Sequence, residues 1–430
     1  MDKNYKKTLL IVLIIFLLTS LYFVTAIVCY QTGKKAGRHS VTAKETGSVT
    51  NTDNPVADQK TSNETVSGIV TGQSKHPSET VSNPMANSSA EQMPEQVEEH
   101  NEKTYTTDQN VPSSKYSDTI ANAQTGTPLA RHGKLYVNEI DLMDEYHQRF
   151  QLKGVSTHGL QWYPEYINYE SFKTLRDDWS ANVVRLAMYT GEGGYMTRGN
   201  QAQLESKIDD GVSYCTQLGM YCIIDWHILS DGNPNQYKEG AKEFFRKMSE
   251  KYKNHTNILY EICNEPNGGV SWSEVKSYAD EIISVIRAND SDAIIIVGTP
   301  TWSQDVDVVA ANPVANPHNV MYAFHFYAAT HKDYLRNKVM TARNNQTPVI
   351  ISEFSICDAS GSGSIDYDSA RQWSDFIDNN NLSYIGWNLS NKNELSALIS
   401  PDCLKTSGWS IDELSETGKW LRKRIRDDFP

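Results

Sequence analysis

Two glutamates stand beside imidazole and aromatic side chains in a pattern that could support acid and base chemistry. Glu265 lies in an Asn-Glu-Pro segment at the end of an apolar run, and Glu353 lies at the end of a later apolar run. Two carboxylates can divide catalytic work when their surroundings push their pKa values apart, because one then carries a proton while the other stays ionised. These two residues are therefore the first candidates for catalysis.

Other polar residues occupy the same kind of position, at or near the ends of apolar runs: His158, Arg185, Tyr189, Asp225, His227, Asn264, His325, Tyr327, Trp387 and Asn388. A lone charged residue there is more often a solvated cap or a structural ion pair. Two glutamates together with several His, Tyr and Trp residues favour a site. Glycoside hydrolysis needs one acid for the leaving oxygen, one carboxylate for the anomeric carbon, and flat faces for sugar rings.

Neither His227 nor His325 has metal-ligand spacing such as His-Glu-x-x-His. We therefore expect no metal and no organic cofactor.

The elements that must position these residues are eight short runs rich in apolar and β-branched side chains, separated by segments with helical apolar spacing. The runs are residues 152–156, 182–189, 221–227, 258–265, 293–299, 320–327, 349–354 and 382–390. Regular alternation of strand and helix predicts an α/β fold with a parallel sheet, here a (β/α)8 TIM barrel. The active site of such a barrel lies at the C-terminal ends of its strands, so we expect these polar residues to lie together on that rim. Residues 134–143 predict a short hairpin that plugs the opposite end.

The N-terminal part of the chain has a different character. Residues 8–30 carry no charge and are long enough to span a bilayer, so residues 1–38 predict a membrane anchor; a cleaved signal with Val24-Thr25-Ala26 as its cleavage site is the alternative. Residues 39–125 are rich in Ser, Thr, Asn and Glu and predict a disordered linker. All nine tryptophans follow position 160, so residues 126–430 are expected to form the catalytic barrel.

Charge and cysteine content exclude other classes. The chain carries 53 acidic and 40 basic side chains, a net charge of −13, which disfavours binding to nucleic acid. Six cysteines without zinc-like spacing are too few for a disulfide scaffold. We expect Cys215, Cys222, Cys263, Cys357 and Cys403 to be buried free thiols, with a single disulfide as the alternative.

The motifs that hold these residues resemble glycoside hydrolase family 5, and most closely its subfamily 2 of bacterial endo-β-1,4-glucanases, or cellulases. They are LKGVSTHGLQWY at 152–163, IIDWH at 223–227, ICNEPNG at 262–268, GTPTWSQDV at 298–306, HFY at 325–327, DASG at 358–361 and WNLS at 387–390. The resemblance extends over roughly residues 128–425.

The resemblance implies a role for each central residue. Glu265 is the expected general acid/base, with a raised pKa in the resting state, and Glu353 the expected nucleophile. The family retains anomeric configuration, so the two carboxylates should lie about 5 Å apart and form a covalent glycosyl-enzyme intermediate. Arg185 and Tyr327 are expected to hold Glu353 ionised, and Asn264 to bind the sugar 2-hydroxyl. His227 and His325 are expected to contact sugar hydroxyls or the glutamates.

The family's other substrate contacts map onto His158, Trp162, Tyr163, Tyr189, Ala359, Ser360, Trp387, Lys392 and Glu394. Trp162 and Trp387 are the expected stacking platforms, whereas Trp179 and Trp373 are expected in the core. Three positions depart from the family's pattern. Phe354-Ser355 follows Glu353 in place of Trp-Gly, Cys263 replaces a small apolar residue, and Asn391 replaces an Asp.

The expected partner is thus a β-1,4-glucan polysaccharide or oligosaccharide, hydrolysed by a monomeric catalytic domain outside the cell. The domain would stay on the cell surface through its anchor, or be secreted if the signal is cleaved. A related polymer such as mannan, xyloglucan or mixed-linkage β-glucan is an alternative substrate. A surface protein that binds glucan without cleaving it is a more distant alternative.

Overall fold

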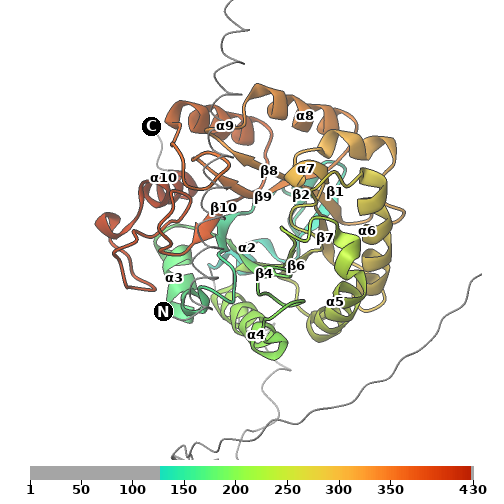
Figure 1. The fold of residues 1–430 in the computed structure, drawn as a ribbon, viewed down its shortest axis with the longest axis horizontal. Coiled ribbons are helices and arrows are strands. Elements are labelled where there is room, and N and C mark those ends of the chain that lie inside the picture. The colour runs from blue at the N-terminus through green and yellow to red at the C-terminus, as the bar shows by residue number, and fades with distance from the viewer. Residues whose placement is uncertain (1–125, 428–430) are drawn as a thin grey trace, which may run out of the picture. The chain divides into compact units, whose positions relative to one another are not determined.

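Eight parallel strands close into a barrel in the computed structural model, which describes residues 126–427. Each strand is hydrogen-bonded to the next in chain order, and β10 closes the ring by pairing with β3 (Figure 1). The strands are β3 (Lys153–Thr157), β4 (Val183–Tyr189), β5 (Tyr221–His227), β6 (Ile258–Glu261), β7 (Ile294–Val297), β8 (Val320–Tyr327), β9 (Val349–Ser355) and β10 (Tyr384–Leu389). The expected (β/α)8 architecture is therefore confirmed.

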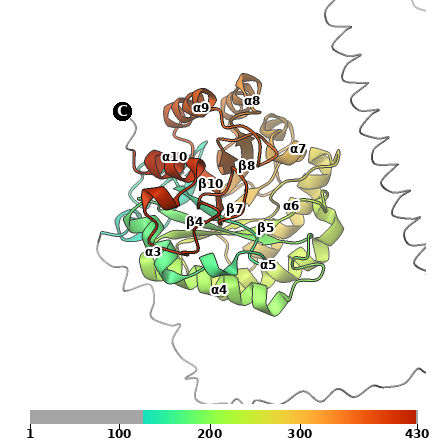
Figure 2. The same ribbon diagram turned by 60° about the vertical axis from the view of Figure 1, so that its left-hand side comes forward.

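Helices surround the barrel on its outside, as both ribbon views show (Figures 1 and 2). They are α3 (Tyr169–Asp177), α4 (Gln201–Leu218), α5 (Lys238–Tyr252), α6 (Trp272–Arg287), α8 (Asp333–Asn344), α9 (Tyr367–Asn379) and α10 (Glu416–Ile425), with the short α2 (Pro128–His132) and α7 (Pro300–Ser303). The sequence encodes their starts: Ser271 and Glu274, for example, form a reciprocal capping box at α6. The apolar stripe of each long helix then packs on the strands, so β4 and β5 are buried at every residue.

A hairpin covers the N-terminal end of the barrel, as the sequence predicts. Strand β1 (Tyr136–Asn138) pairs antiparallel with β2 (Asp141–Met143). Leu135, Leu142 and Phe150 pack in one buried cluster with residues from the beginnings of the barrel strands, among them Tyr221 and Leu259. This cluster fills the interior at the N-terminal end of the barrel.

Two of the expected strands are shorter than the apolar pattern suggests. The run 258–265 forms strand only over Ile258–Glu261, and 293–299 only over Ile294–Val297. The Ile262 amide still donates to the backbone oxygen of Ile296 on β7. The Asn264 amide instead donates to the backbone oxygen of Trp226 on β5, so the regular pairing of β6 with β7 has ended. The expectation that Glu265 ends a strand was therefore wrong: it stands on the loop after β6.

Trp179 and Trp373 are both buried in the core, as expected, although only one of them is helical. Trp373 lies on α9, whereas Trp179 follows the C-cap of α3, Asp178, and is not helical. The five cysteines between residues 126 and 427 are all buried and free, which confirms the reading as small apolar thiols.

The expected membrane span at 8–30 and the linker at 39–125 lie outside the described residues. Within residues 126–427, no helix combines the length and apolar character needed to cross a bilayer.

Candidate active site

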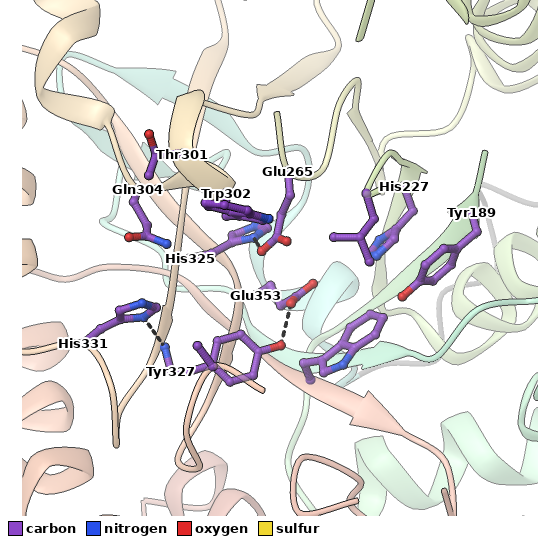
Figure 3. Close-up of a pocket in the computed structure, with 13 residues that line it drawn as sticks. Tyr189, His227, Glu265, Thr301, Trp302, Gln304, His325, Tyr327, His331 and Glu353 are labelled. Atoms are coloured by element: carbon purple, nitrogen blue, oxygen red, sulfur yellow. Dashed lines mark hydrogen bonds and ion pairs between the residues drawn. The ribbon is translucent and has the colours of Figure 1, made fainter. Parts of the chain in front are cut away.

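A cavity of about 540 Å³ opens at the rim where the barrel strands end (Figure 3). It brings together many of the residues that the sequence singles out. Its lining includes Tyr189, His227, Glu265, His325, Tyr327, Glu353, Ala359 and Trp387, together with Leu229, Thr301, Trp302, Gln304 and His331. The remaining expected residues surround this group or lie beneath it.

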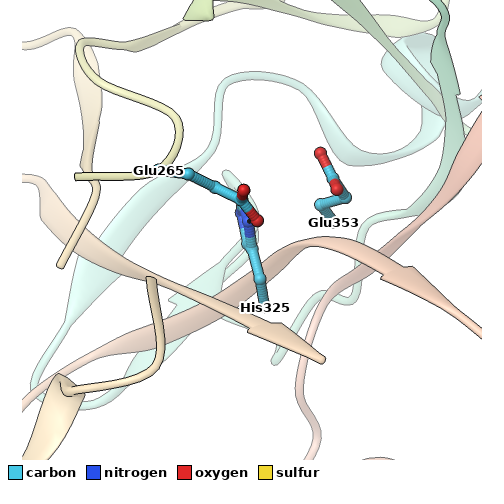
Figure 4. A group of neighbouring side chains, drawn as sticks. All are labelled: Glu265, His325 and Glu353. Carbon is cyan, nitrogen blue, oxygen red and sulfur yellow. Dashed lines mark hydrogen bonds and ion pairs between the residues drawn. The ribbon is translucent and has the colours of Figure 1, made fainter. Parts of the chain in front are cut away.

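The two glutamates face the same cavity from different elements. Glu353 projects from β9, and Glu265 from the loop after β6, with His325 of β8 between their strands (Figure 4). An oxygen of Glu265, an oxygen of Glu353 and a ring nitrogen of His325 all lie within 4.8 Å of one another. This spacing matches a retaining pair, because inverting pairs are separated by about 6.5–9.5 Å to leave room for a water molecule.

Glu353 is surrounded by donors that favour its ionised form. The Tyr327 hydroxyl donates to its Oε1 at 2.8 Å, and the Arg185 Nη1 lies 3.3 Å from its Oε2. Burial and the neighbouring Glu265 carboxylate act in the opposite direction and raise the pKa of Glu353 to about 7.

Arg185 is a fully buried cation that joins several carboxylates beneath the cavity. Its Nε donates to Glu261 Oε2 at 2.7 Å, and its Nη2 lies 3.0 Å from Asp225 Oδ2. The same Nη2 donates to Asn264 Oδ1 at 2.7 Å. A buried guanidinium needs such partners, because an unpaired charge in the interior is very costly. Arg185 thereby fixes the positions of Glu353, Asn264 and the two deeper acids relative to one another.

Asn264 is fully buried, and protein atoms already engage its amide. While Oδ1 accepts from Arg185, Nδ2 bonds the backbone oxygen of Ile228 at 3.1 Å and lies 3.2 Å from His227 Nε2. Asn264 is not among the residues that line the cavity. Contact with a sugar 2-hydroxyl therefore stays a prediction that would require a shared or rearranged hydrogen bond.

His227 is held as a neutral imidazole. Burial lowers its pKa well below the usual range, and the Arg185 and His325 charges lower it further. Its Nδ1 lies 2.6 Å from Asp225 Oδ2, so this nitrogen carries the proton and Nε2 is left as an acceptor. The ring stacks on Trp387, with centroids 5.2 Å apart and planes 13° apart.

Aromatic rings form one wall beside His227. Tyr189 and Trp387 lie at the cavity, and the His158 ring lies within 6.2 Å of the rings of Trp162, Tyr163, Tyr189 and Trp387. Trp162 is 42% exposed, which suits a stacking platform. Trp387 is only 6% exposed, so little of its ring is accessible from the cavity that it lines. The wall offers flat apolar surfaces of the kind that sugar rings bind.

Lys392 and Glu394 form an ion pair at the outer end of this wall. Lys392 Nζ lies 2.6 Å from Glu394 Oε2 and 3.4 Å from His158 Nε2. Glu394 also accepts hydrogen bonds from Asn388 and Ser396, which keep it in place. Ser360 bonds Asp358 within its own loop, next to Ala359 on the cavity wall.

The three departures from the family's pattern are accommodated without disturbing the cavity. Phe354 is buried outside the barrel and stacks on Phe326 at 5.1 Å. Cys263 is buried, with its thiol 4.0 Å from the Gly298 oxygen. Asn391 donates to the backbone oxygen of Cys403 at 3.1 Å, so it braces the loop after β10.

Several contributors were missed by sequence reasoning. Glu261 and Ser352 lie inside buried strands and complete the hydrogen bonds beneath the glutamates; the only available signal was a charged residue within an apolar run. His331 lines the cavity, and its Nδ1 accepts from the Tyr327 amide. Trp302 also lines the cavity and is 46% exposed; the signal for it is its place in the GTPTWSQDV motif.

The donor set does not suit a metal ion. Both ring nitrogens of His325 are already engaged, Nδ1 with Glu265 Oε1 at 2.9 Å and Nε2 with Ser352 Oγ at 2.9 Å. A metal ion at Glu265, His325 and Glu353 would have to replace the contact between His325 Nδ1 and Glu265.

Comparison with known proteins agrees with this geometry. A family model described as "Cellulase (glycosyl hydrolase family 5)" matches residues 143–393, which include both glutamates. Endoglucanase 5 of Pectobacterium carotovorum subsp. carotovorum is 44% identical over 306 residues, covering 71% of this chain and 60% of that protein. Endoglucanase A of Evansella cellulosilytica is 50% identical over 279 residues, covering 64% of this chain and 56% of that protein. The chain thus spans less than two thirds of the length of these two relatives.

Among solved structures, the catalytic domain of Thermobifida fusca endoglucanase Cel5A in complex with cellotetraose is 38% identical, with a TM-score of 0.66. The match covers 70% of this chain and 100% of that one.

Proposed function

Since this chain belongs to glycoside hydrolase family 5, the cellulase family, we propose that it is a retaining endo-β-1,4-glucanase acting on cellulose-type glucans. The observation that carries the proposal is the pair of glutamates within 4.8 Å on one cavity wall, with an arginine and a tyrosine directed at only one of them. That asymmetry assigns different roles to the two carboxylates. The names of the related endoglucanases support the same substrate class.

In the first step, a Glu353 oxygen attacks the anomeric carbon while Glu265 donates its proton to the glycosidic oxygen. The bond between that carbon and oxygen breaks, the leaving sugar departs with the proton, and an ester to Glu353 remains. The charge of Glu353 is lost in the ester, so the proton affinity of Glu265 falls and it becomes a base.

In the second step, Glu265 removes a proton from water, and the water oxygen bonds to the anomeric carbon. The ester breaks and Glu353 is released as a carboxylate, which returns both residues to their starting states. One water is consumed, and the anomeric configuration is retained because it is inverted twice.

The test is hydrolysis of carboxymethylcellulose and cellotetraose by the full-length chain. Glu353→Gln should abolish activity because the nucleophile is lost, and Glu265→Gln should lower kcat by about 10²- to 10⁴-fold. Glu250→Gln, at an exposed glutamate on α5, is the matched control and should match wild type. Proton NMR of the first product formed should show the β anomer. A wild-type chain inert on every β-glucan would refute the proposal.

We also propose that the chain works outside the cell, held there by residues 8–30. A polymeric substrate cannot enter the cytoplasm, and the charge-free run is long enough to serve as an anchor. Secretion after cleavage near Ala26 is the alternative arrangement.

A panel of cellulose derivative, mannan, xyloglucan and mixed-linkage glucan would define the preferred polymer.

A further inference from the structure

The deepest polar residues of the site form a chain of hydrogen bonds that ends on Glu265. Ser352 Oγ donates to Glu261 Oε1 at 2.7 Å, and His325 Nε2 lies 2.9 Å from the same Ser352 oxygen. On the other side of the ring, His325 Nδ1 lies 2.9 Å from Glu265 Oε1. All members are buried; Glu265 and His325 line the cavity, whereas Glu261 and Ser352 do not.

The direction of these bonds assigns one proton of His325. The Ser352 hydroxyl has a single hydrogen, which is used on Glu261, so its oxygen can only accept from His325. The Nε2 atom is therefore protonated. Whether the ring is neutral or charged then depends on Nδ1 alone, the nitrogen that faces Glu265.

Charges around the ring favour the imidazolium. Burial opposes it, but Glu261, Glu265 and Glu353 outweigh burial and raise the pKa of His325 to about 9. Burial likewise opposes ionisation of Glu261, yet Arg185 and His325 lower the pKa of this acid to about 2.

The other groups that face His325 are few. The His325 charge acts on Asp225 and His227 of β5, and β9 contributes Glu353 beside His325 in register. The remaining neighbour of β8 is β7, Ile294–Val297, which has no titratable side chain. Glu261 is thus the ionised carboxylate whose negative charge stabilises the His325 cation.

We propose that Glu261, acting through Ser352, holds His325 as an imidazolium whose Nδ1–H faces Glu265, and so sets the acid strength of that residue. The inference rests on the proposed function of Glu265 as acid/base. When Glu265 gives its proton to the leaving oxygen, the new carboxylate accepts from a charged donor already in place. Glu261 and Ser352 are positioning residues, because they touch neither substrate nor reacting atoms.

Ser352→Ala tests this without removing a charge. Loss of the hydroxyl removes the hydrogen-bonded bridge between Glu261 and His325 and leaves only their direct contact at 3.8 Å, so the imidazolium is less stable and Glu265 becomes a weaker acid. We expect the alkaline limb of the pH profile of kcat/KM on cellotetraose to move up by about 0.5–1 pH unit. Activity at the optimum should fall about tenfold on cellotetraose, but less than about threefold on 2,4-dinitrophenyl β-cellobioside, whose leaving group needs no proton.

Two matched variants separate this role from a loss of packing. Ser352→Thr keeps the hydroxyl and should restore the wild-type alkaline limb. Ser374→Ala removes a buried serine hydroxyl on α9, bonded only to the Ala370 oxygen, and should leave the profile in place. An unmoved limb in Ser352→Ala, or equal losses on the two substrates, would overturn the proposal.

The protonation state of His325 can also be measured directly in the wild-type chain. Nitrogen-15 NMR of its histidines should show one ring with both nitrogens protonated at pH 7, assigned by its absence in His325→Gln. A neutral His325 at pH 7 would contradict the inference. Failure of wild type to hydrolyse cellotetraose would instead refute the proposed function, so the two failures are distinguishable.

Discussion

At the scale of single residues, the two glutamates differ because of what surrounds them. Glu353 accepts from Tyr327 and lies beside the Arg185 guanidinium, whereas Glu265 meets the ring of His325. Burial and mutual repulsion make full ionisation of the pair unfavourable, as for any two carboxylates that share a site. Ionising both carboxylates in the folded protein therefore lowers its free energy of unfolding.

This effect can be measured through Glu353→Gln. The folded-state pKa of Glu353, about 7, is above its ordinary value of 4.5, so the folded protein binds more protons than the unfolded one between these pH values. Stability should therefore fall as pH rises from 4.5 to 7. Removing the carboxylate should stabilise the protein by about 1–3 kcal/mol at pH 8, with the gain vanishing near pH 4.

Thermal unfolding of wild type and Glu353→Gln at pH 4 and pH 8 provides the measurement. Glu250→Gln is again the control and should show no pH-dependent difference from wild type. An equal or lower Tm for Glu353→Gln at pH 8 would contradict the raised pKa.

At the scale of elements, short loops after the strands carry much of the site. The loop after β6 turns Glu265 toward the cavity, and α7 after β7 presents Trp302. Thr301, Trp302 and Ser303 all have left-handed backbone angles, with φ of 59°, 56° and 55°. Such angles are unfavourable for residues with a Cβ, so the surrounding structure must hold this turn in place. Trp302 stands next to Glu265 in Figure 3, on the side away from Tyr189.

We expect Trp302 to stack on the sugar that leaves with the Glu265 proton. Trp302→Ala should remove about 1 kcal/mol of stacking and so raise KM for cellohexaose several-fold. Steady-state kinetics on cellohexaose would measure this. The control is Tyr146→Ala, an exposed aromatic just after the hairpin at the other end of the barrel, which should leave KM unchanged. An unaltered KM in Trp302→Ala would remove Trp302 from the binding surface.

At the scale of the whole molecule, the chain combines a catalytic barrel with a long polar segment and a charge-free run. The net charge of −13 suits a neutral polymer and disfavours nucleic acid. The proposed arrangement places the barrel outside the membrane, with the polar residues 39–125 between it and the proposed anchor.

Cells that express the full-length chain should therefore carry cellulase activity in their membrane fraction. Trypsin added to intact cells should release that activity into the medium, because the spacer contains lysines between anchor and barrel. Mass spectrometry of the native N-terminus should find residues 8–30 intact. Activity found only in the medium before proteolysis, with a new N-terminus near residue 27, would show secretion instead.

The barrel and its catalytic rim were predictable from the sequence, because eight alternating strand and helix segments favour a closed parallel sheet whose strands end on one side. The two glutamates were predictable from the motifs that contain them. The hairpin and the buried cysteines were predictable from the sequence as well. The contacts of Glu261 with Ser352 and with Arg185 became evident only in the folded barrel. These contacts join strands far apart in the chain and depend on register and side-chain direction inside the barrel. A charged residue in an apolar run indicates a buried partner, but only the closed barrel shows which one.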